Sequence, residues 1–160
     1  MDEYRESYCV PFLDFVSGTQ DAHDCWQVDG FWPDRVKASL DHVLVWGTEI
    51  GLTYLNNGGM NAYLQFISGR TLPEVSRGFG VLKCFRSQQV CKKTIRRFGA
   101  TFPRSDAERA AVVESDPDYF EECGSELWDA MKADDYETIA EAYYKSVCDA
   151  HAIPPKRYGR

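Results

Sequence analysis

Apolar residues recur along most of the chain with the period of an α-helix. From residue 34 onward they return every three or four positions, beginning with Val36, Leu40, Val43, Gly47, Ile50 and Tyr54. That spacing places them along one face of a helix. The pattern therefore predicts a long core helix over about 34–55, with this face turned toward the interior.

A run of residues that tolerate positive φ follows this helix: Asn56, Asn57, Gly58 and Gly59. Helical spacing resumes directly afterwards, at Met60, Tyr63, Leu64 and Ile67. We therefore predict a helix, a tight turn over 56–59 and a second helix. Converging backbone N–H groups in such a turn could also hold an anion, but no basic side chain adjoins it, so a plain structural turn is favoured.

Capping side chains mark the starts of several further helices. Each stands just ahead of periodic apolar positions, and proline occupies the first turn in two cases. The capping residues are Thr71, Ser87, Ser105, Asp116 and Asp134. The one plausible strand is a short piece near Trp26–Phe31, where the alternation of apolar and polar residues is weak.

The length of the chain, 160 residues, is that of one domain. Together with the helical periodicity, it predicts an all-α fold: a single compact array of about seven or eight helices. We expect an irregular acidic N-terminal segment over 1–33, a helical core over 34–149 and a C-terminal tail over 150–160.

Composition argues for a cytoplasmic protein. No stretch approaches the roughly 20 consecutive apolar residues that cross a bilayer. Asp2 and Glu3 stand where a secretory signal would carry positive charge. The six cysteines are scattered without CxxC spacing, which favours reduced thiols in the cytosol: Cys9, Cys25, Cys84, Cys91, Cys123 and Cys148.

The net charge of −7 is unevenly distributed. Residues 1–34 and 116–149 are strongly acidic, whereas residues 70–109 carry ten basic against three acidic side chains. Two explanations stay open. The basic middle could pair with the acidic ends, within the chain or between subunits, or the acidic part could face a basic partner.

Catalytic and metal-binding motifs are absent from the sequence, and we predict no catalytic residue, metal or cofactor. Cys9, His23 and Cys25 could be drawn as three metal ligands, but no fourth stands at a suitable spacing. A hydrolase that uses His42 or His23 with a nearby carboxylate remains an alternative.

The basic run from Lys92 to Arg97 could contact a phosphate backbone, but a solvated helix face is favoured because the chain as a whole is acidic. We therefore expect no direct binding of nucleic acid.

The candidate binding residues are carboxylates on two successive helices. On the first, five of them over eleven residues, at about 1.5 Å each, give roughly one charge per 3 Å, near the about 3.4 Å of one DNA strand. The second helix extends the acidic surface. The predicted set is Asp116, Asp118, Glu121, Glu122, Glu126, Asp129, Asp134, Asp135, Glu137 and Glu141.

The segment from Tyr54 to Gly69 resembles the DNA-mimic-protein family of small acidic bacterial proteins. It carries the NNGG turn of that family, then an aromatic residue, Tyr63, and then Ser68-Gly69. The resemblance covers roughly residues 34–148. It implies an all-α fold, often dimeric, that presents carboxylates in place of DNA phosphates to a transcription factor. The basic middle and the Met60-Asn61-Ala62 sequence depart from the family pattern.

These observations predict a non-enzymatic interaction protein. Its acidic face, from Asp116 to Glu141, would bind a basic surface such as that of a DNA-binding transcription factor. The alternative is an immunity-type inhibitor that turns the same carboxylates toward a basic toxin or nuclease. Monomer and homodimer both stay open.

Overall fold

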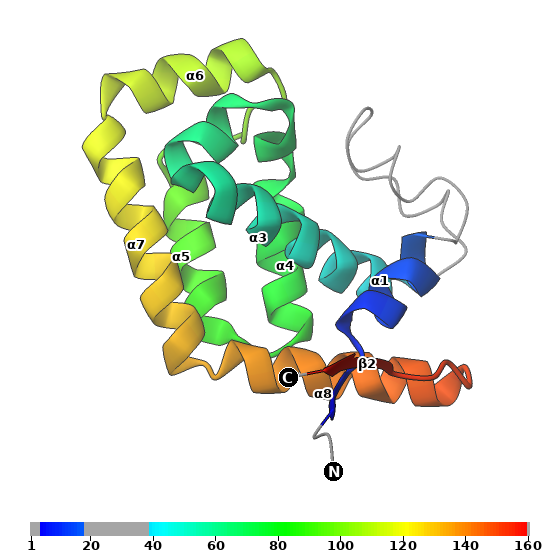
Figure 1. The fold of residues 1–160 in the computed structure, drawn as a ribbon. Coiled ribbons are helices and arrows are strands. Elements are labelled where there is room, and N and C mark those ends of the chain that lie inside the picture. The colour runs from blue at the N-terminus through cyan, green and yellow to red at the C-terminus, as the bar shows by residue number, and fades with distance from the viewer. Residues whose placement is uncertain (1–3, 18–38, 160) are drawn as a thin grey trace.

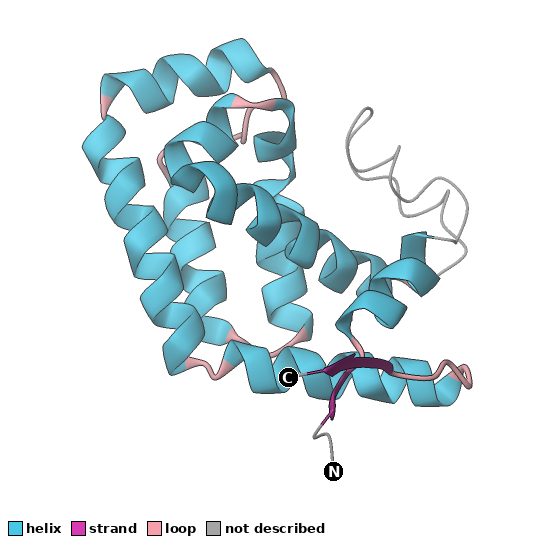
Figure 2. Cartoon of the chain, in the orientation of Figure 1, coloured by secondary structure: helices cyan, strands magenta, loops and turns pink. Residues whose placement is uncertain are grey.

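The computed structural model of the chain describes residues 4–17 and 39–159. Helices dominate these ranges, which confirms the all-α prediction (Figures 1 and 2). The α-helices are α1 (Cys9–Ser17), α3 (Leu40–Gln65), α4 (Leu72–Val81), α5 (Phe85–Arg96), α6 (Asp106–Ser115), α7 (Pro117–Ala133) and α8 (Tyr136–Ala150). A 3-10 helix, η2, spans Ile67–Thr71, and two short strands, β1 (Tyr4–Ser7) and β2 (Lys156–Gly159), lie near the chain ends.

Four helices close around the core. Helix α3 packs on α4, α4 on α5, α5 on α7, and α7 back on α3. Helix α6 crosses one end of this group and α8 crosses the opposite end, at the top and bottom of Figure 1. Helix α1 packs against α8 and α3, so the N-terminal part of the chain covers the end that α8 forms.

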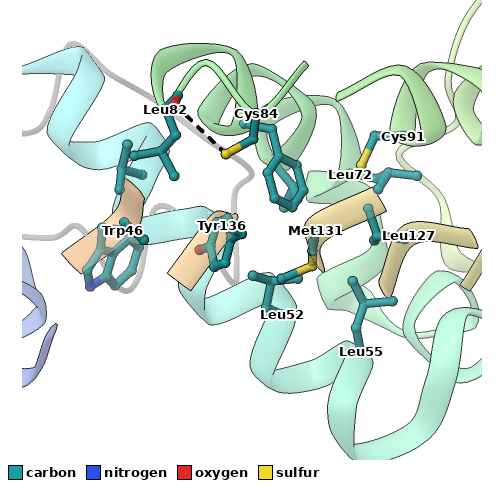
Figure 3. Close-up of a cluster of buried hydrophobic side chains, with 14 of the residues drawn as sticks. Trp46, Leu52, Leu55, Leu72, Leu82, Cys84, Cys91, Leu127, Met131 and Tyr136 are labelled. Atoms are coloured by element: carbon teal, nitrogen blue, oxygen red, sulfur yellow. Dashed lines mark hydrogen bonds between the residues drawn. The ribbon is translucent and has the colours of Figure 1, made fainter. Parts of the chain in front are cut away.

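The core is filled by apolar side chains from α3, α4, α5, α7 and α8, none more than 8% exposed (Figure 3). It includes Trp46, Leu52, Leu55, Leu72, Leu82, Cys91, Leu127, Met131 and Tyr136. Burying one such side chain contributes about 1.5–3 kcal/mol. These contacts join the α-helices in one continuous cluster, to which α1 contributes Phe12 and Val16 and α6 contributes Val113.

Helices α3 and α4 approach each other closely at Gly78. A Cβ atom there would lie 2.0 Å from Oγ1 of Thr48 and 2.5 Å from the carbonyl oxygen of Leu44. The Thr48 hydroxyl is itself buried and donates to that carbonyl at 2.9 Å. Glycine at this position therefore lets the two backbones pack without a gap.

Helix α3 is buried more widely than a one-sided pattern predicts. All six residues from Val43 to Thr48 are buried, whereas Leu40 and Tyr54, both expected on the inner face, are 38% and 37% exposed. The reason is that α1, α4, α6 and α7 all pack against α3. Along residues 43–48 the helix therefore has no solvent face, whereas an exposed side returns from Thr53 onward.

Of the predicted tight turn over Asn56–Gly59, only Gly59 leaves the helical conformation, with φ of 73° and ψ of 178°. Two helical segments meet at a kink there, so Tyr63 after the kink lies close to Gly51 before it, with the Tyr63 hydroxyl 3.5 Å from where a Cβ atom of residue 51 would lie. The positive φ explains why glycine stands there. The helix begins at Leu40, because Ser39 caps it by accepting the N–H of His42 at 3.3 Å. The expected residues 34–38 and the strand near Trp26–Phe31 lie outside the described residues.

The chain ends are more regular than the sequence suggested. Within the segment expected to be irregular, α1 forms because Phe12 and Val16, one helical turn apart, are both fully buried. Within the expected tail, β2 pairs antiparallel with β1, with Ser7 opposite Lys156. A two-stranded ladder of four residues each is too short to leave a clear alternating pattern.

Arg109 on α6 is fully buried and ties three segments together. Its guanidinium donates to the carbonyls of Leu64 and Phe66 at the end of α3, and to those of Pro103 and Arg104 in the loop before α6. A fifth bond, of 2.6 Å, joins it to the carboxylate of Asp106 in the first turn of α6. A buried charge is tolerated where all its donors find acceptors in this way.

We expect Arg109→Ala to lower the free energy of unfolding by about 3–5 kcal/mol, because it leaves buried carbonyls without a donor and opens a cavity. Denaturant unfolding followed by circular dichroism measures the change. Arg77→Ala, at an exposed position on α4, is the matched control and should stay within about 0.5 kcal/mol of the parent. Equal stability of the two variants would contradict the role assigned to Arg109.

No helix in the described part of the chain is both long and apolar enough to cross a membrane.

Candidate binding surface and the adjoining cleft

The ten carboxylates expected to bind a partner divide into two groups. Four make hydrogen bonds or ion pairs with other elements of the fold: the partly buried Asp116, Asp134 and Glu141, and Glu126, which is exposed at the edge of α7. The others are exposed, and no hydrogen bond or ion pair within the described residues involves four of their side chains: Asp118, Glu121, Glu122 and Glu137. The acidic surface is therefore smaller than the sequence suggested.

Two of these four carboxylates form ion pairs with basic side chains at the C-terminal part of α5. Lys93 lies 2.5 Å from Glu126, and Arg97 lies 2.8 Å from Asp116. Both cations also lie over the ring of Tyr119, at 5.8 and 5.3 Å from its centroid. Each exposed pair contributes at most about 1 kcal/mol, but together they line the junction of α5 and α7.

The basic middle of the chain thus pairs partly with the acidic C-terminal part and partly with itself. Arg104 binds the buried carboxylate of Glu74 through two hydrogen bonds, of 2.8 and 3.1 Å. Lys92 and Arg96 stay exposed on the outer side of α5, as the sequence predicted.

Asp134 has a different role from the predicted cap of the last helix. Its carboxylate accepts the backbone N–H groups of Arg86 and Ser87, at 3.3 and 2.8 Å, and the Ser87 hydroxyl at 2.8 Å. It therefore caps the start of α5, a helix 47 residues earlier in the chain. The prediction that Ser87 caps this helix is also wrong, because α5 begins at Phe85. The residue that precedes α8 is Asp135.

Glu141 anchors the N-terminal part of the chain to α8. Its carboxylate accepts the backbone N–H of Tyr8 at 2.6 Å and the hydroxyl of Ser7 at 3.4 Å. The two remaining exposed carboxylates make weak contacts. Asp129 lies 3.7 Å from Lys132, both highly exposed, and Asp135 accepts the hydroxyl of Thr138.

A cleft of about 580 Å³ lies next to the acidic surface, between α1, α3, α7 and α8. Two predicted residues, Glu137 and Glu141, line it. The rest of its lining was not anticipated: Cys9, Glu49, Leu52, Thr53, Asn56, Trp128, Met131, Tyr136, Ala140 and Tyr144.

Glu49 of α3 holds the polar centre of this cleft. The hydroxyls of Tyr136 and Tyr144 both donate to the same oxygen, Oε1. Burial, above all, raises the pKa of both tyrosines, and the negative charge of Glu49 raises it further, so the hydroxyls stay protonated and act as donors. A signal existed in the sequence: Tyr136 and Tyr144 are eight residues apart, on one face of α8.

The cysteine in the cleft is a poor nucleophile. Burial, with the nearby charges of Glu49 and Glu141, raises the pKa of Cys9 to about 12, so the thiol is protonated at neutral pH. Cys9, Cys84, Cys91, Cys123 and Cys148 are all free thiols. No group of three or more potential metal ligands occurs among the described residues, and His23 and Cys25 lie outside them.

His42 lies among aromatic rings. Its ring centroid is 6.5 Å from that of Phe12, 6.0 Å from that of Tyr143 and 6.4 Å from that of His151. Burial lowers the pKa of His42, with a further lowering by His151. The imidazole is therefore mostly neutral at pH 7, and its packing accounts for its position beside α1.

Comparison of the chain with protein-family models, with curated proteins and with solved structures gives no match in any of the three.

Carboxylates that contact other elements should contribute to stability, and those without such contacts should not. Asp134→Ala should lower the free energy of unfolding by about 1–2 kcal/mol, because the start of α5 loses its cap. Glu121→Ala, at an exposed position without a partner among the described residues, should change it by less than about 0.5 kcal/mol. Thermal and denaturant unfolding of both variants measure the difference. A loss as large for Glu121→Ala as for Asp134→Ala would contradict the division.

Proposed function

We propose that the protein is a non-enzymatic interaction protein that binds a basic partner through the exposed face of α7. The observation that carries the proposal is the set of exposed carboxylates on this face that make no ion pair with another described residue: Asp118, Glu121 and Glu122. The partner class we propose is a DNA-binding protein such as a transcription factor, toward which these side chains stand in for DNA phosphates.

The spacing of the charges supports this class of partner. Without Glu126, which Lys93 neutralises, four carboxylates from Asp118 to Asp129 still occupy about 16 Å of helix, or about one charge per 4 Å, and of these only Asp129 has a described cation nearby, Lys132 at 3.7 Å. One DNA strand carries a charge every 3.4 Å or so. A rigid helix holds such charges in place before binding, which lowers the entropy lost on association.

The basic helix α5 is compatible with such a face. Lys93 and Arg97 are paired with Glu126 and Asp116 where the two helices meet. The basic side chains that lie between α5 and α7 are thus paired with carboxylates, and Lys132, the one basic residue of α7 itself, lies beside Asp129 near the end of the helix. A field of one sign steers a basic partner toward the surface.

The test is affinity capture from a lysate of the source cells with a charge-reversed variant. Asp118→Lys/Glu122→Lys should lose the partner that the parent protein captures, and capture by the parent should weaken at high salt because screening grows. Glu108→Lys/Glu114→Lys on α6 is the matched control, since it makes the same change of charge and also alters the first turn of a helix. This control should retain the partner.

Mass spectrometry of the captured protein decides between the partner classes. A basic DNA-binding protein that DNA displaces supports mimicry of DNA. A basic toxin or nuclease supports the immunity-type inhibitor in its place. Equal capture by the α7 variant and the α6 control contradicts the proposed surface.

A further inference from the structure

The cleft beside α7 combines carboxylates with aromatic walls and contains no basic side chain. Of its twelve lining residues, three are glutamates, Glu49, Glu137 and Glu141, and three are aromatic: Trp128, Tyr136 and Tyr144. Lysine and arginine are absent from the lining, although they make up 18 of the 160 residues of the chain. A volume of about 580 Å³ is within the usual range for small-molecule sites.

We propose that this cleft binds an organic cation: an alkylguanidinium or alkylammonium group of a few carbon atoms. The charged head would lie at Glu49, and the alkyl stem would contact Trp128, Met131 and Leu52. The proposal does not depend on partner binding by α7, because its central residue, Glu49, belongs to α3.

Glu49 is suited to this role by the way it is held. Both tyrosine hydroxyls bind Oε1, and within the described residues no hydrogen bond to Oε2 competes with a ligand. The carboxylate is thus fixed in direction before a ligand arrives, while keeping an acceptor for an N–H donor. A charge-assisted bond of this kind is roughly twice as strong as a neutral one.

The aromatic walls select for the same chemistry. A cation is attracted to the face of a tryptophan or tyrosine ring, most strongly when water is excluded. Neutral ligands can only donate hydrogen bonds to the three carboxylates, without the attraction of opposite charges, and anions are repelled by them. The cleft therefore discriminates by charge first and by the apolar stem second.

The experiment compares two ligands of nearly the same shape. N-butylguanidinium and its neutral counterpart N-butylurea are titrated into the full chain, and backbone amide and tryptophan indole NMR signals are followed. We expect the shifts caused by N-butylguanidinium to saturate and to be largest around Trp128, and N-butylurea to bind at least about tenfold more weakly. Equal affinity for the two, or no saturation with N-butylguanidinium up to about 10 mM, overturns the proposal.

Variants then identify the residue that binds the charge. Glu49→Gln keeps an acceptor for both tyrosines but removes the charge, and should weaken binding of N-butylguanidinium about tenfold or more. Glu114→Gln, which changes the net charge equally on exposed α6, should leave it unchanged. Should Glu49→Gln fail to fold, Trp128→Leu replaces it and should weaken both ligands. Binding that is the same in a folded Glu49→Gln as in Glu114→Gln overturns the assignment.

The source of the cation is a separate question with its own probe. N-acetyl-arginine methylamide carries the same head group on a peptide backbone. Binding equal to that of N-butylguanidinium identifies an arginine side chain of another protein as a ligand that fits. Binding of N-butylguanidinium alone identifies a free small amine or guanidine, and both results support the proposed chemistry.

Discussion

The position of the acidic helix depends on the buried guanidinium of Arg109. Its five hydrogen bonds join the end of α3, the loop before α6 and the first turn of α6. Helix α6 then leads into α7 through a single residue, Asp116. Burial lowers the pKa of Arg109, and the hydrogen bond and charge of Asp106 counteract this lowering only in part. The direction in which α7 leaves α6 follows from this arrangement.

Charge has two separate uses in this fold. Where α5 and α7 meet, opposite charges pair: Lys93 with Glu126 and Arg97 with Asp116. The carboxylate of Asp134, in the loop after α7, caps the start of α5 in place of a neighbouring side chain. This acidic residue therefore also contributes to the packing of the fold. Three further carboxylates of α7, Asp118, Glu121 and Glu122, are exposed and make no ion pair with another described residue. This part of α7 is acidic because the basic side chains nearest to it, Lys93 and Arg97, are already paired with Glu126 and Asp116.

The sequence predicted elements whose signals are local. Ser105 and Asp116 occupy the positions directly before α6 and α7, although neither side chain accepts a capping hydrogen bond, and Pro117 stands in the first turn of α7, where proline is favoured. It did not predict contacts between distant segments. The role of Asp134 depends on backbone groups 47 residues away, and the bonds of Glu49 come from residues 87 and 95 positions later. Periodicity alone contains no information about such partners.

The cleft shows why these distant contacts matter for binding. Its walls come from α1, α3, α7 and α8, and α1 lies against α8 partly because Glu141 accepts the N–H of Tyr8. The segment that the sequence presented as irregular therefore places Cys9 in the lining. Glu137 lines the cleft and lies on the surface beside α7, so a ligand in the cleft would change the charge seen at that edge. Glu141 thus acts indirectly in the proposed site, because it holds α1 against α8. Glu49 and Glu137 are the residues whose carboxylates would contact the proposed cation.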